Sequence, residues 1–286
     1  MSDPIAAQPH ERARTVVITG ASDGIGAAAS EQLASAGDRI VVIGRSPEKT
    51  RAVARRIGAE HHVADFARLS EVRELASTLL AECEHIDVLA NNAGGLFSGP
   101  IRTDDGFERT FQVNHLAPVL LTNLLLDRLI ASRASVVNTS SAAARLFGHV
   151  DLDDLDGWKG FSPNRAYGNA KLANVLFAKG LHERFHAQGL SAVAFHPGVV
   201  ATSFASDTTS PLRRLYFGAL RRFLTSPEGG GAALSYFIAG APGEAWQSGE
   251  YYRSPGRIGR TNPQASDPEL VRSHWEQSAR MLGITW

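Results

Sequence analysis

The sequence has 286 residues, 43% of them apolar, which is enough for one large domain or two small ones with a sizeable buried core. Its formal net charge is zero, so no global electrostatic field favours nucleic acid as a partner. Its one cysteine, Cys83, excludes an intrachain disulfide and a cysteine-based metal cluster, and we expect no metal site.

The N-terminal residues 1–14 are polar and lack the apolar segment of a signal peptide, so they are predicted to form a flexible tail. No uninterrupted apolar run in the sequence is long enough to span a bilayer. The low cysteine content fits a reducing compartment. We therefore expect a cytoplasmic protein without stable membrane attachment.

From residue 15 onward, short β-branched runs alternate with longer helical patterns. The predicted strands cover Thr15–Thr19, Arg39–Ile43, His61–Ala64, Asp87–Ala90, Ser135–Thr139 and Leu190–Phe195. The predicted helices between them cover Gly24–Ala36, Pro47–Ile57, Ser70–Cys83, Asp104–Ile130 and Pro163–Gln188. Such alternation is typical of a parallel sheet covered by helices on both faces. We predict an α/β fold, a doubly wound Rossmann domain with a mostly parallel central sheet.

The last third of the sequence is less regular. Helices are predicted over Pro211–Leu224, Glu228–Ala239 and Pro268–Leu282, with a short strand near Tyr251. No repeat and no low-complexity linker divides the chain, so we expect one domain over residues 15–286.

The turn after the first predicted strand is rich in glycine, because Thr19–Gly26 reads TGASDGIG and opens the first predicted helix. Gly20 would permit a tight turn, Gly24 would let the backbone approach a pyrophosphate, and Gly26 would allow close helix–strand packing. The helix N-terminus offers unpaired N–H groups to phosphate oxygens. A strand before the turn and a helix after it favour a dinucleotide site over a ligand-free connection.

The end of the second predicted strand indicates which dinucleotide binds. An NAD site usually places an acid there, whereas the 2′-phosphate of NADP needs a cation. Here the strand ends in Ile43-Gly44-Arg45, and Asp38 lies at the opposite end of the strand. The guanidinium group of Arg45 can bind a phosphate through two parallel N–H groups, which favours NADP(H) over NAD(H).

A tyrosine and a lysine, Tyr167 and Lys171, lie one helical turn apart on a predicted helix. A free phenol titrates near ~10, and a cation held beside it favours the phenolate. Such a pair can exchange a proton with a carbonyl or alcohol oxygen. On spacing alone, a packed ring beside a solvated ammonium is the more common interpretation of such a pair.

These motifs, together with several others in the same order, resemble the short-chain dehydrogenase/reductase family over nearly the whole chain. The further matches are Asp65 after the third strand, the NNAG motif Asn91–Gly94, Asn114 in FQVNHLAP, Ser141 in VVNTSSAA and the PGxxxT segment Pro197–Thr202. The stretch SSAAARLFGHVDLDDLDGWKGFSPNRAYGNAKLANVLFAKGL and the C-terminal DPELVRSHWEQSARMLGI are similar to the retinol-dehydrogenase-like branch. Asp23 departs from the NADP pattern, because many NADP-preferring members carry Lys or Arg in its position.

The resemblance implies four catalytic residues, Asn114, Ser141, Tyr167 and Lys171, with Ser140 as the alternative to Ser141. In this scheme Tyr167 exchanges the proton, Ser141 holds the reacting oxygen, Lys171 assists Tyr167, and Asn114 holds a water that relays protons. The implied cofactor-binding residues are Gly20, Ser22, Asp23, Gly24, Ile25, Gly26, Arg45, Asp65, Phe66, Asn92, Ala93, Gly94, Tyr167, Lys171, Pro197, Gly198, Val200 and Thr202.

The substrate is predicted to be a lipophilic carbonyl or alcohol compound, because apolar residues flank the catalytic segments. The candidate pocket residues are Leu96, Phe97, Leu146, Phe147, Val150, Trp158, Phe161, Phe204, Leu212 and Tyr216. The family analogy also implies a substrate lid over residues 203–226 and a homo-oligomer that pairs helices around Leu116–Leu129 and Leu172–Leu181.

Two other functions remain open at this point. One is an isomerase or lyase that uses bound cofactor, although such relatives usually carry TGxxGxxG and this chain carries TGxxxGIG. The other is a non-catalytic NADP sensor or scaffold, although all four candidate catalytic positions are filled here. The leading prediction is an NADP(H)-dependent oxidoreductase.

Overall fold

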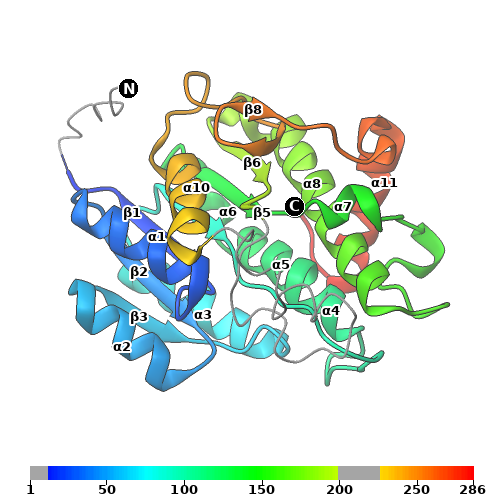
Figure 1. Ribbon diagram of the computed structural model, residues 1–286, viewed down its shortest axis with the longest axis horizontal. Helices are drawn as coiled ribbons and strands as arrows, with labels where there is room; N and C mark the ends of the chain where they lie inside the picture. Colours follow the sequence, from blue (N-terminus) through cyan, green and yellow to red (C-terminus); the bar gives the residue numbers. More distant parts are fainter. Residues whose placement is uncertain (1–11, 199–225) are drawn as a thin grey trace.

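The protein is described by a computed structural model over residues 12–198 and 226–286 (Figure 1). Eight strands form one sheet: β1 (Thr15–Thr19), β2 (Arg39–Gly44), β3 (Glu60–Val63), β4 (Val88–Asn91), β5 (Ser135–Thr139), β6 (Ser191–Phe195), β7 (Tyr251–Ser254) and β8 (Arg257–Ile258). Their order is β3-β2-β1-β4-β5-β6-β7-β8, and only β8 runs antiparallel to its neighbour. The predicted doubly wound, mostly parallel sheet is confirmed.

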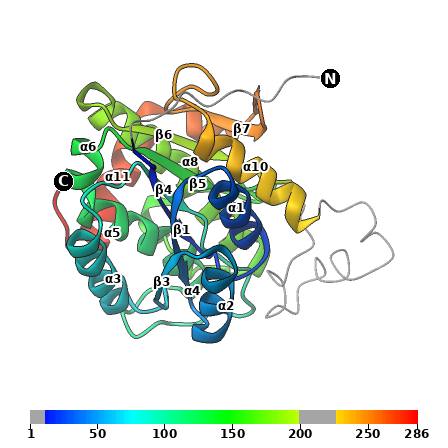
Figure 2. The same ribbon diagram turned by 90° about the vertical axis from the view of Figure 1, so that its left-hand side faces the viewer.

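Helices cover both faces of the sheet (Figure 2). One layer contains α1 (Gly24–Ser35), α2 (Pro47–Ile57) and α10 (Pro227–Ala239). The other contains α3 (Leu69–Glu82), α5 (Ala117–Leu124), α8 (Pro163–Phe185) and α11 (Pro268–Leu282). Successive strand residues point to opposite faces, so Val17 packs in the α3–α8 core while Val16 and Ile18 pack in the α1–α10 core.

Side-chain caps explain where the predicted helices begin. Ser46, Ser162, Ser226 and Asp267 each precede a proline, and their side chains accept hydrogen bonds from backbone N–H groups of the first turn. Proline suits this first position because its missing N–H would have no partner there. These helices start where the sequence predicts, or within one residue of it.

The long helix predicted over Asp104–Ile130 is wrong in its start and its continuity. It begins at α4 (Arg109–Phe111), passes through a π-helical turn, Gln112–Leu116, and continues as α5 and α6 (Leu126–Ala131). Pro118 lacks the N–H that would bond the Asn114 carbonyl in a regular α-helix. Glu108 caps the late start, with its side chain accepting from Phe111 N.

Several short elements are not predicted from the sequence. The 3₁₀ turn His186–Gln188 ends the helix predicted over Pro163–Gln188, whereas the unpredicted elements are β8, α7 (Ala143–Leu146) and the 3₁₀ turns Leu152–Asp154 and Pro263–Ser266. Each is too short to give a hydrophobic period.

The helix surfaces that analogy assigns to a dimer interface are partly covered by α11 and the residues after it. The Trp275 ring stacks on Phe177 with centroids 5.5 Å apart, and a Cβ at Gly180 would lie 2.6 Å from Trp275. The Asn123 side chain of α5 donates to the Thr285 carbonyl beyond α11. A homo-oligomer remains a prediction, and it would need surface beyond these contacts.

Some predictions lie outside the described residues. They are most of the tail over 1–14, the helix Pro211–Leu224, the lid over 203–226 apart from Ser226, and the site residues Val200 and Thr202. Among the residues that are described, every helix is too short or too polar to cross a bilayer.

Candidate active site

A cavity of about 600 Å³ opens at the carboxyl ends of the central strands. β1 pairs with β2 on one side and with β4 on the other, so the connections leave β1 and β4 in opposite directions. A crevice at such a switch point is the usual ligand site of a doubly wound sheet. Here the cavity extends continuously from Arg45 to Tyr167.

The glycine turn between β1 and α1 forms one wall of the cavity. Gly20 has φ +66°, and a Cβ there would lie 2.7 Å from the Ala93 Cα atom. A Cβ on Gly26 would lie 2.4 Å from the Gly20 carbonyl oxygen. No larger residue fits either position, and Ser22, Asp23, Gly24 and Ile25 line the same wall. This cradle of exposed backbone at a helix N-terminus fits a dinucleotide pyrophosphate.

The NNAG loop after β4 is bonded directly to the glycine turn. Thr19 Oγ1 accepts from the backbone N–H groups of Asn92 and Ala93, both at 3.0 Å. The Asn92 side chain donates to the Thr19 carbonyl oxygen at 3.0 Å. Asn92, Ala93 and Gly94 all line the cavity. The two motifs therefore form one rigid wall.

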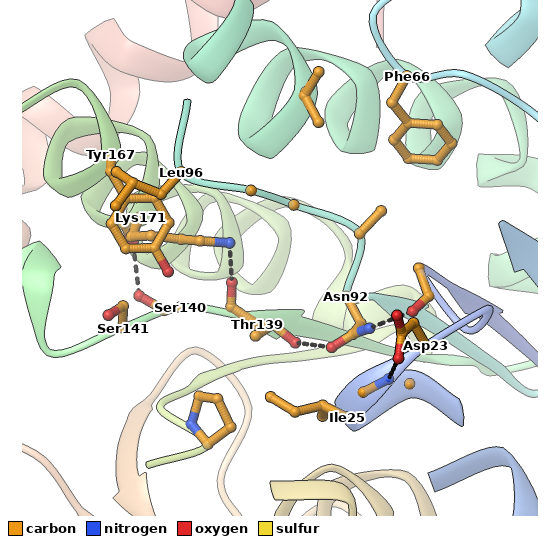
Figure 3. A pocket seen from close by; sticks show the side chains of 18 of the residues that line it. Asp23, Ile25, Phe66, Asn92, Leu96, Thr139, Ser140, Ser141, Tyr167 and Lys171 are labelled. Carbon is orange, nitrogen blue, oxygen red and sulfur yellow. Dashed lines mark hydrogen bonds between the residues drawn. The ribbon is translucent and has the colours of Figure 1, made fainter. Parts of the chain in front are cut away.

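The predicted adenosine-binding residues gather at the end of the cavity near β2 and β3. Arg45, Asp65 and Phe66 all line it. Asp65 Oδ1 accepts from Ala67 N at 3.0 Å, so this carboxylate also caps its own turn. Phe66 lies far from Tyr167 across the cavity (Figure 3).

One cation of this region was missed by the sequence prediction. Lys49, in the first turn of α2, lines the cavity, and its Nζ lies 2.8 Å from Asp23 Oδ2. The pair is about half exposed. Asp23 Oδ1 also accepts from Gly24 N, so Asp23 caps α1. The available signal was the position of Lys49 one helical turn after Arg45, beside a predicted helix start.

Asn114 does not line the cavity, although it braces the cavity wall. Its side chain donates to the carbonyl oxygens of Gly95 and Thr110 and accepts from Gly95 N. A Cβ on Gly94 would lie 2.4 Å from Asn114 Oδ1 and 3.2 Å from Lys171 Nζ. The NNAG glycine thus leaves room for both side chains.

Tyr167 and Lys171 project from α8 into the other end of the cavity, facing Ser141 beyond the end of β5 (Figure 3). Lys171 Nζ lies 5.6 Å from the centroid of the Tyr167 ring and donates to the Thr139 carbonyl oxygen at 3.0 Å. Lys171 is only 2% exposed. This burial lowers the pKa of its ammonium to about 7.

The two serines after β5 have different surroundings. Ser140 is buried, and its hydroxyl donates to the Lys171 carbonyl oxygen at 2.7 Å, which ties β5 to α8. Ser141 is partly exposed to the cavity, and its Oγ accepts from Ala143 N at 3.2 Å. That bond leaves the Ser141 hydroxyl hydrogen available to a ligand oxygen.

The predicted apolar pocket is only partly assembled in the described residues. Leu96, Phe97, Leu146 and Phe147 line the cavity, and Leu146 is 69% exposed at its rim. Three predicted pocket residues, Val150, Trp158 and Phe161, do not line it, and Val150 instead packs in the core on the α8 side of the sheet. Trp158 stacks under the Arg102 guanidinium at 4.5 Å. Phe204, Leu212 and Tyr216 lie outside the described residues.

The residues after β6 also line the cavity. Pro197 and Gly198 line the cavity as predicted, and His196 joins them. His196 Nδ1 is buried without a hydrogen-bond partner among the described residues. Burial lowers the pKa of His196, so this ring is neutral at physiological pH.

Comparison with known proteins identifies the family of this chain. Residues 14–212 match the family described as short chain dehydrogenase. Human retinol dehydrogenase 13 is 38% identical over 95% of this chain and 85% of its own length. A candidate daunorubicin C-13 ketoreductase of Streptomyces sp. (strain C5) is 39% identical over 95% of this chain and 93% of its own length.

Among solved structures, a protein from Mycobacterium paratuberculosis superposes with a TM-score of 0.76 at 31% identity, covering 96% of each chain. The family consists of oxidoreductases that use NAD or NADP, and the residues around this cavity fit such a cofactor. The chain belongs to the short-chain dehydrogenase/reductase family, in its retinol-dehydrogenase-like branch.

Proposed function

We propose that this protein is an NADP(H)-preferring oxidoreductase that interconverts a lipophilic carbonyl compound and its alcohol. One observation carries the proposal: Ser141, Tyr167 and Lys171 face the same cavity as the glycine turn and Arg45. A scaffold needs only the cofactor wall of such a cavity. A dehydrogenase needs both ends.

A bound nicotinamide dinucleotide supplies or accepts the hydride at the substrate carbon. In the reductive direction, the Tyr167 hydroxyl gives its proton to the substrate oxygen, and it takes the proton back in oxidation. The Ser141 hydroxyl donates to the same oxygen, which stabilises the charge that develops on it. The Lys171 ammonium, held in a low-dielectric site, favours the phenolate form of Tyr167.

Asn114 supports this machinery from behind the cavity wall. Its side-chain hydrogen bonds are all to backbone atoms of Gly95 and Thr110. We propose that Asn114 holds the NNAG loop against Lys171. A water relay at Asn114 would have to use its backbone carbonyl.

The NADP preference rests on the two cations at the adenosine end. Arg45 offers a planar fork of N–H donors, and Lys49 adds a point charge at the same wall. Asp23 alone would repel a 2′-phosphate, but its ion pair with Lys49 offsets this charge. The balance of these three groups favours NADP(H).

The lipophilic substrate rests on the apolar rim formed by Leu96, Phe97, Leu146 and Phe147. Exposed Leu146 and Phe147 side chains beside a catalytic cavity favour a ligand that covers them. Retinol and daunorubicin, the compounds in the names of two relatives, are both of this kind.

A panel of aldehydes and ketones tests this function directly. Purified protein is mixed with each compound and NADPH or NADH, and loss of reduced cofactor is followed by absorbance. We expect turnover that increases with the apolar size of the carbonyl compound and is faster with NADPH. Tight NADPH binding without turnover of any compound would instead support the sensor or scaffold.

A further inference from the structure

Behind the catalytic lysine, a chain of buried polar side chains runs from the cavity wall to α11. Its members are Asn174 on α8, His115 in the π-helical turn and Ser278 on α11, exposed by 3%, 0% and 2%. None of them lines the cavity. Polar groups this deeply buried are retained at a cost in desolvation unless their hydrogen bonds are well formed.

The Asn174 amide joins two backbone carbonyl groups of different elements, the π-helical turn and β5. Its Nδ2 donates to the Asn114 carbonyl oxygen at 3.1 Å and to the Thr139 carbonyl oxygen at 3.3 Å. The Thr139 oxygen is also the acceptor of Lys171 Nζ, at 3.0 Å. Asn174 and Lys171 therefore share one acceptor at the end of β5.

The surroundings of Asn174 determine how its amide is oriented. If the amide were flipped, Oδ1 would face two carbonyl oxygens and Nδ2 would lose both acceptors. With Nδ2 toward the carbonyls, Oδ1 faces His115 Nδ1 at 3.0 Å, and only a donor can satisfy it. His115 therefore carries its hydrogen on Nδ1.

The other ring nitrogen of His115 completes the chain. Nε2 is then an acceptor, and it receives the Ser278 hydroxyl hydrogen at 3.3 Å. Burial lowers the pKa of His115 to about 4, and the nearby Lys171 charge acts in the same direction. The ring is neutral at working pH, so the direction of every hydrogen bond is fixed.

We propose that Asn174, oriented by His115, is a positioning residue for Lys171: it ties the end of β5 to the π-helical turn and shares the carbonyl acceptor of the lysine. This inference rests on the proposed role of Lys171 in catalysis. Asn174 touches neither the cavity nor a reacting atom, so it acts only through the lysine and the Asn114 turn.

The effect of removing Asn174 has a definite sign. Without the amide hydrogens, the Thr139 carbonyl oxygen loses a positive partner and attracts the Lys171 ammonium more strongly. The described titratable groups that face Lys171 are Tyr167 from α8 and His115 from the π-helical turn, with His274 of α11 behind His115 at 4.9 Å between ring centroids. His115 and His274 are both neutral, so neither offsets this change.

The test compares Asn174→Leu with the wild type by NMR titration of the lysine ε-methylene groups, without cofactor, from about pH 5 to about pH 11. The sequence contains Lys49, Lys159, Lys171 and Lys179 as its lysines, so the spectrum is simple to assign. We expect the titration midpoint of Lys171 to rise by about one pH unit and kcat to fall about tenfold, with its pH profile moved in the same direction.

Asn138→Leu is the matched control. Asn138 lies on the same strand as Thr139, is equally buried, and bonds to Asn91 and the Val193 carbonyl without touching Lys171. It should lose stability while Lys171 titrates as in the wild type. An unchanged Lys171 midpoint in folded Asn174→Leu, or an equal shift in Asn138→Leu, would overturn the proposal.

A second pair of variants applies if Asn174→Leu does not fold. His115→Asn keeps an N–H donor close to the position of Nδ1, whereas His115→Leu removes it. We expect Lys171 to titrate normally in the first variant and to shift in the second; equal behaviour of the two would contradict the orienting role of His115. The NMR titration of Lys171 needs no substrate. If the wild type showed no turnover, the proposed function would be rejected, but the effect of Asn174 on Lys171 could still be measured.

Discussion

The two ends of the cavity are held together by different forces. At the proposed catalytic end, Lys171 is 2% exposed and its ammonium donates to the Thr139 carbonyl oxygen of β5. At the adenosine end, Lys49 and Asp23 form an ion pair that is about half exposed. The first end is buried and held in place by packing and hydrogen bonds, whereas the second is exposed to solvent and held by an ion pair.

This difference indicates what each end can tolerate. Proton transfer needs atoms placed to a fraction of an ångström, and burial supplies that placement and perturbs the pKa of the lysine. Cofactor choice needs only a favourable potential near a phosphate, which surface charges supply and salt weakens. We expect the catalytic end to respond to packing and pH, and the adenosine end to charge and ionic strength.

The largest expected effect is at the catalytic end. Tyr167→Phe removes the proton donor without changing the shape of the ring, so kcat should fall by about 10³-fold. NADPH binding, measured by fluorescence or calorimetry, should stay within about twofold, since Tyr167 is one of many contacts. Tyr236→Phe is the control, because its hydroxyl donates to the Ala245 carbonyl away from the cavity. Full turnover in Tyr167→Phe would remove Tyr167 from the mechanism.

The next largest effect is expected from adding a single methyl group at Gly94. A Cβ there would lie 2.4 Å from Asn114 Oδ1, so Gly94→Ala must displace Asn114, Lys171 or the NNAG loop. We expect a loss of about 1–3 kcal/mol in the free energy of unfolding and about 10²-fold in kcat. Gly37→Ala, in an open turn with nothing within 4 Å, should lose stability only. Equal kcat in Gly94→Ala and the wild type would show that the wall is not rigid.

At the adenosine end, we expect three substitutions to change cofactor binding by graded amounts. Arg45→Ala is expected to weaken NADPH binding by about 10–100-fold and NADH binding hardly at all, because only NADPH carries the 2′-phosphate. Lys49→Ala should have a smaller effect in the same direction, and Asp23→Asn should tighten NADPH. All three differences should shrink at high salt. If Arg45→Ala weakens the binding of both cofactors equally, Arg45 does not bind the 2′-phosphate.

The smallest expected effect concerns the buried histidines behind the catalytic end. Burial lowers the pKa of His115 to about 4 and that of His274 well below its usual value. Below pH ~6.5 these histidines take up protons in the unfolded chain but not in the folded protein. The free energy of unfolding therefore falls as the pH drops through this range. In His274→Leu, the slope between about pH 5 and 6 should decrease by about 1 kcal/mol per pH unit. Denaturant titrations at several pH values measure it; an unchanged slope would mean that His274 is protonated in the fold.

Much of the fold and of the cofactor wall could be predicted from sequence because the signals are local. β-branched runs predict most of the strands. A serine or aspartate before a proline marks four helix starts, of which three are predicted at the right residue and one is predicted a residue late. The glycine spacing of Gly20, Gly24 and Gly26 predicts the turn, and the structure shows why no larger residue fits at Gly20 and Gly26. The prediction of one long helix over Asp104–Ile130 failed because Pro118 and a π-helical turn interrupt a continuous apolar pattern.

The sequence by itself determined the type of the longer elements, and it identified Tyr167 and Lys171 by their spacing and Ser141 by family resemblance as the candidate catalytic residues. Only the tertiary structure decided which groups share an acceptor or an ion pair. Lys49 meets Asp23 across 26 residues, and Asn174 meets Asn114 across 60. Such contacts arise because parallel strands bring their carboxyl ends to one edge, and no local pattern records which distant side chains then lie within hydrogen-bond distance.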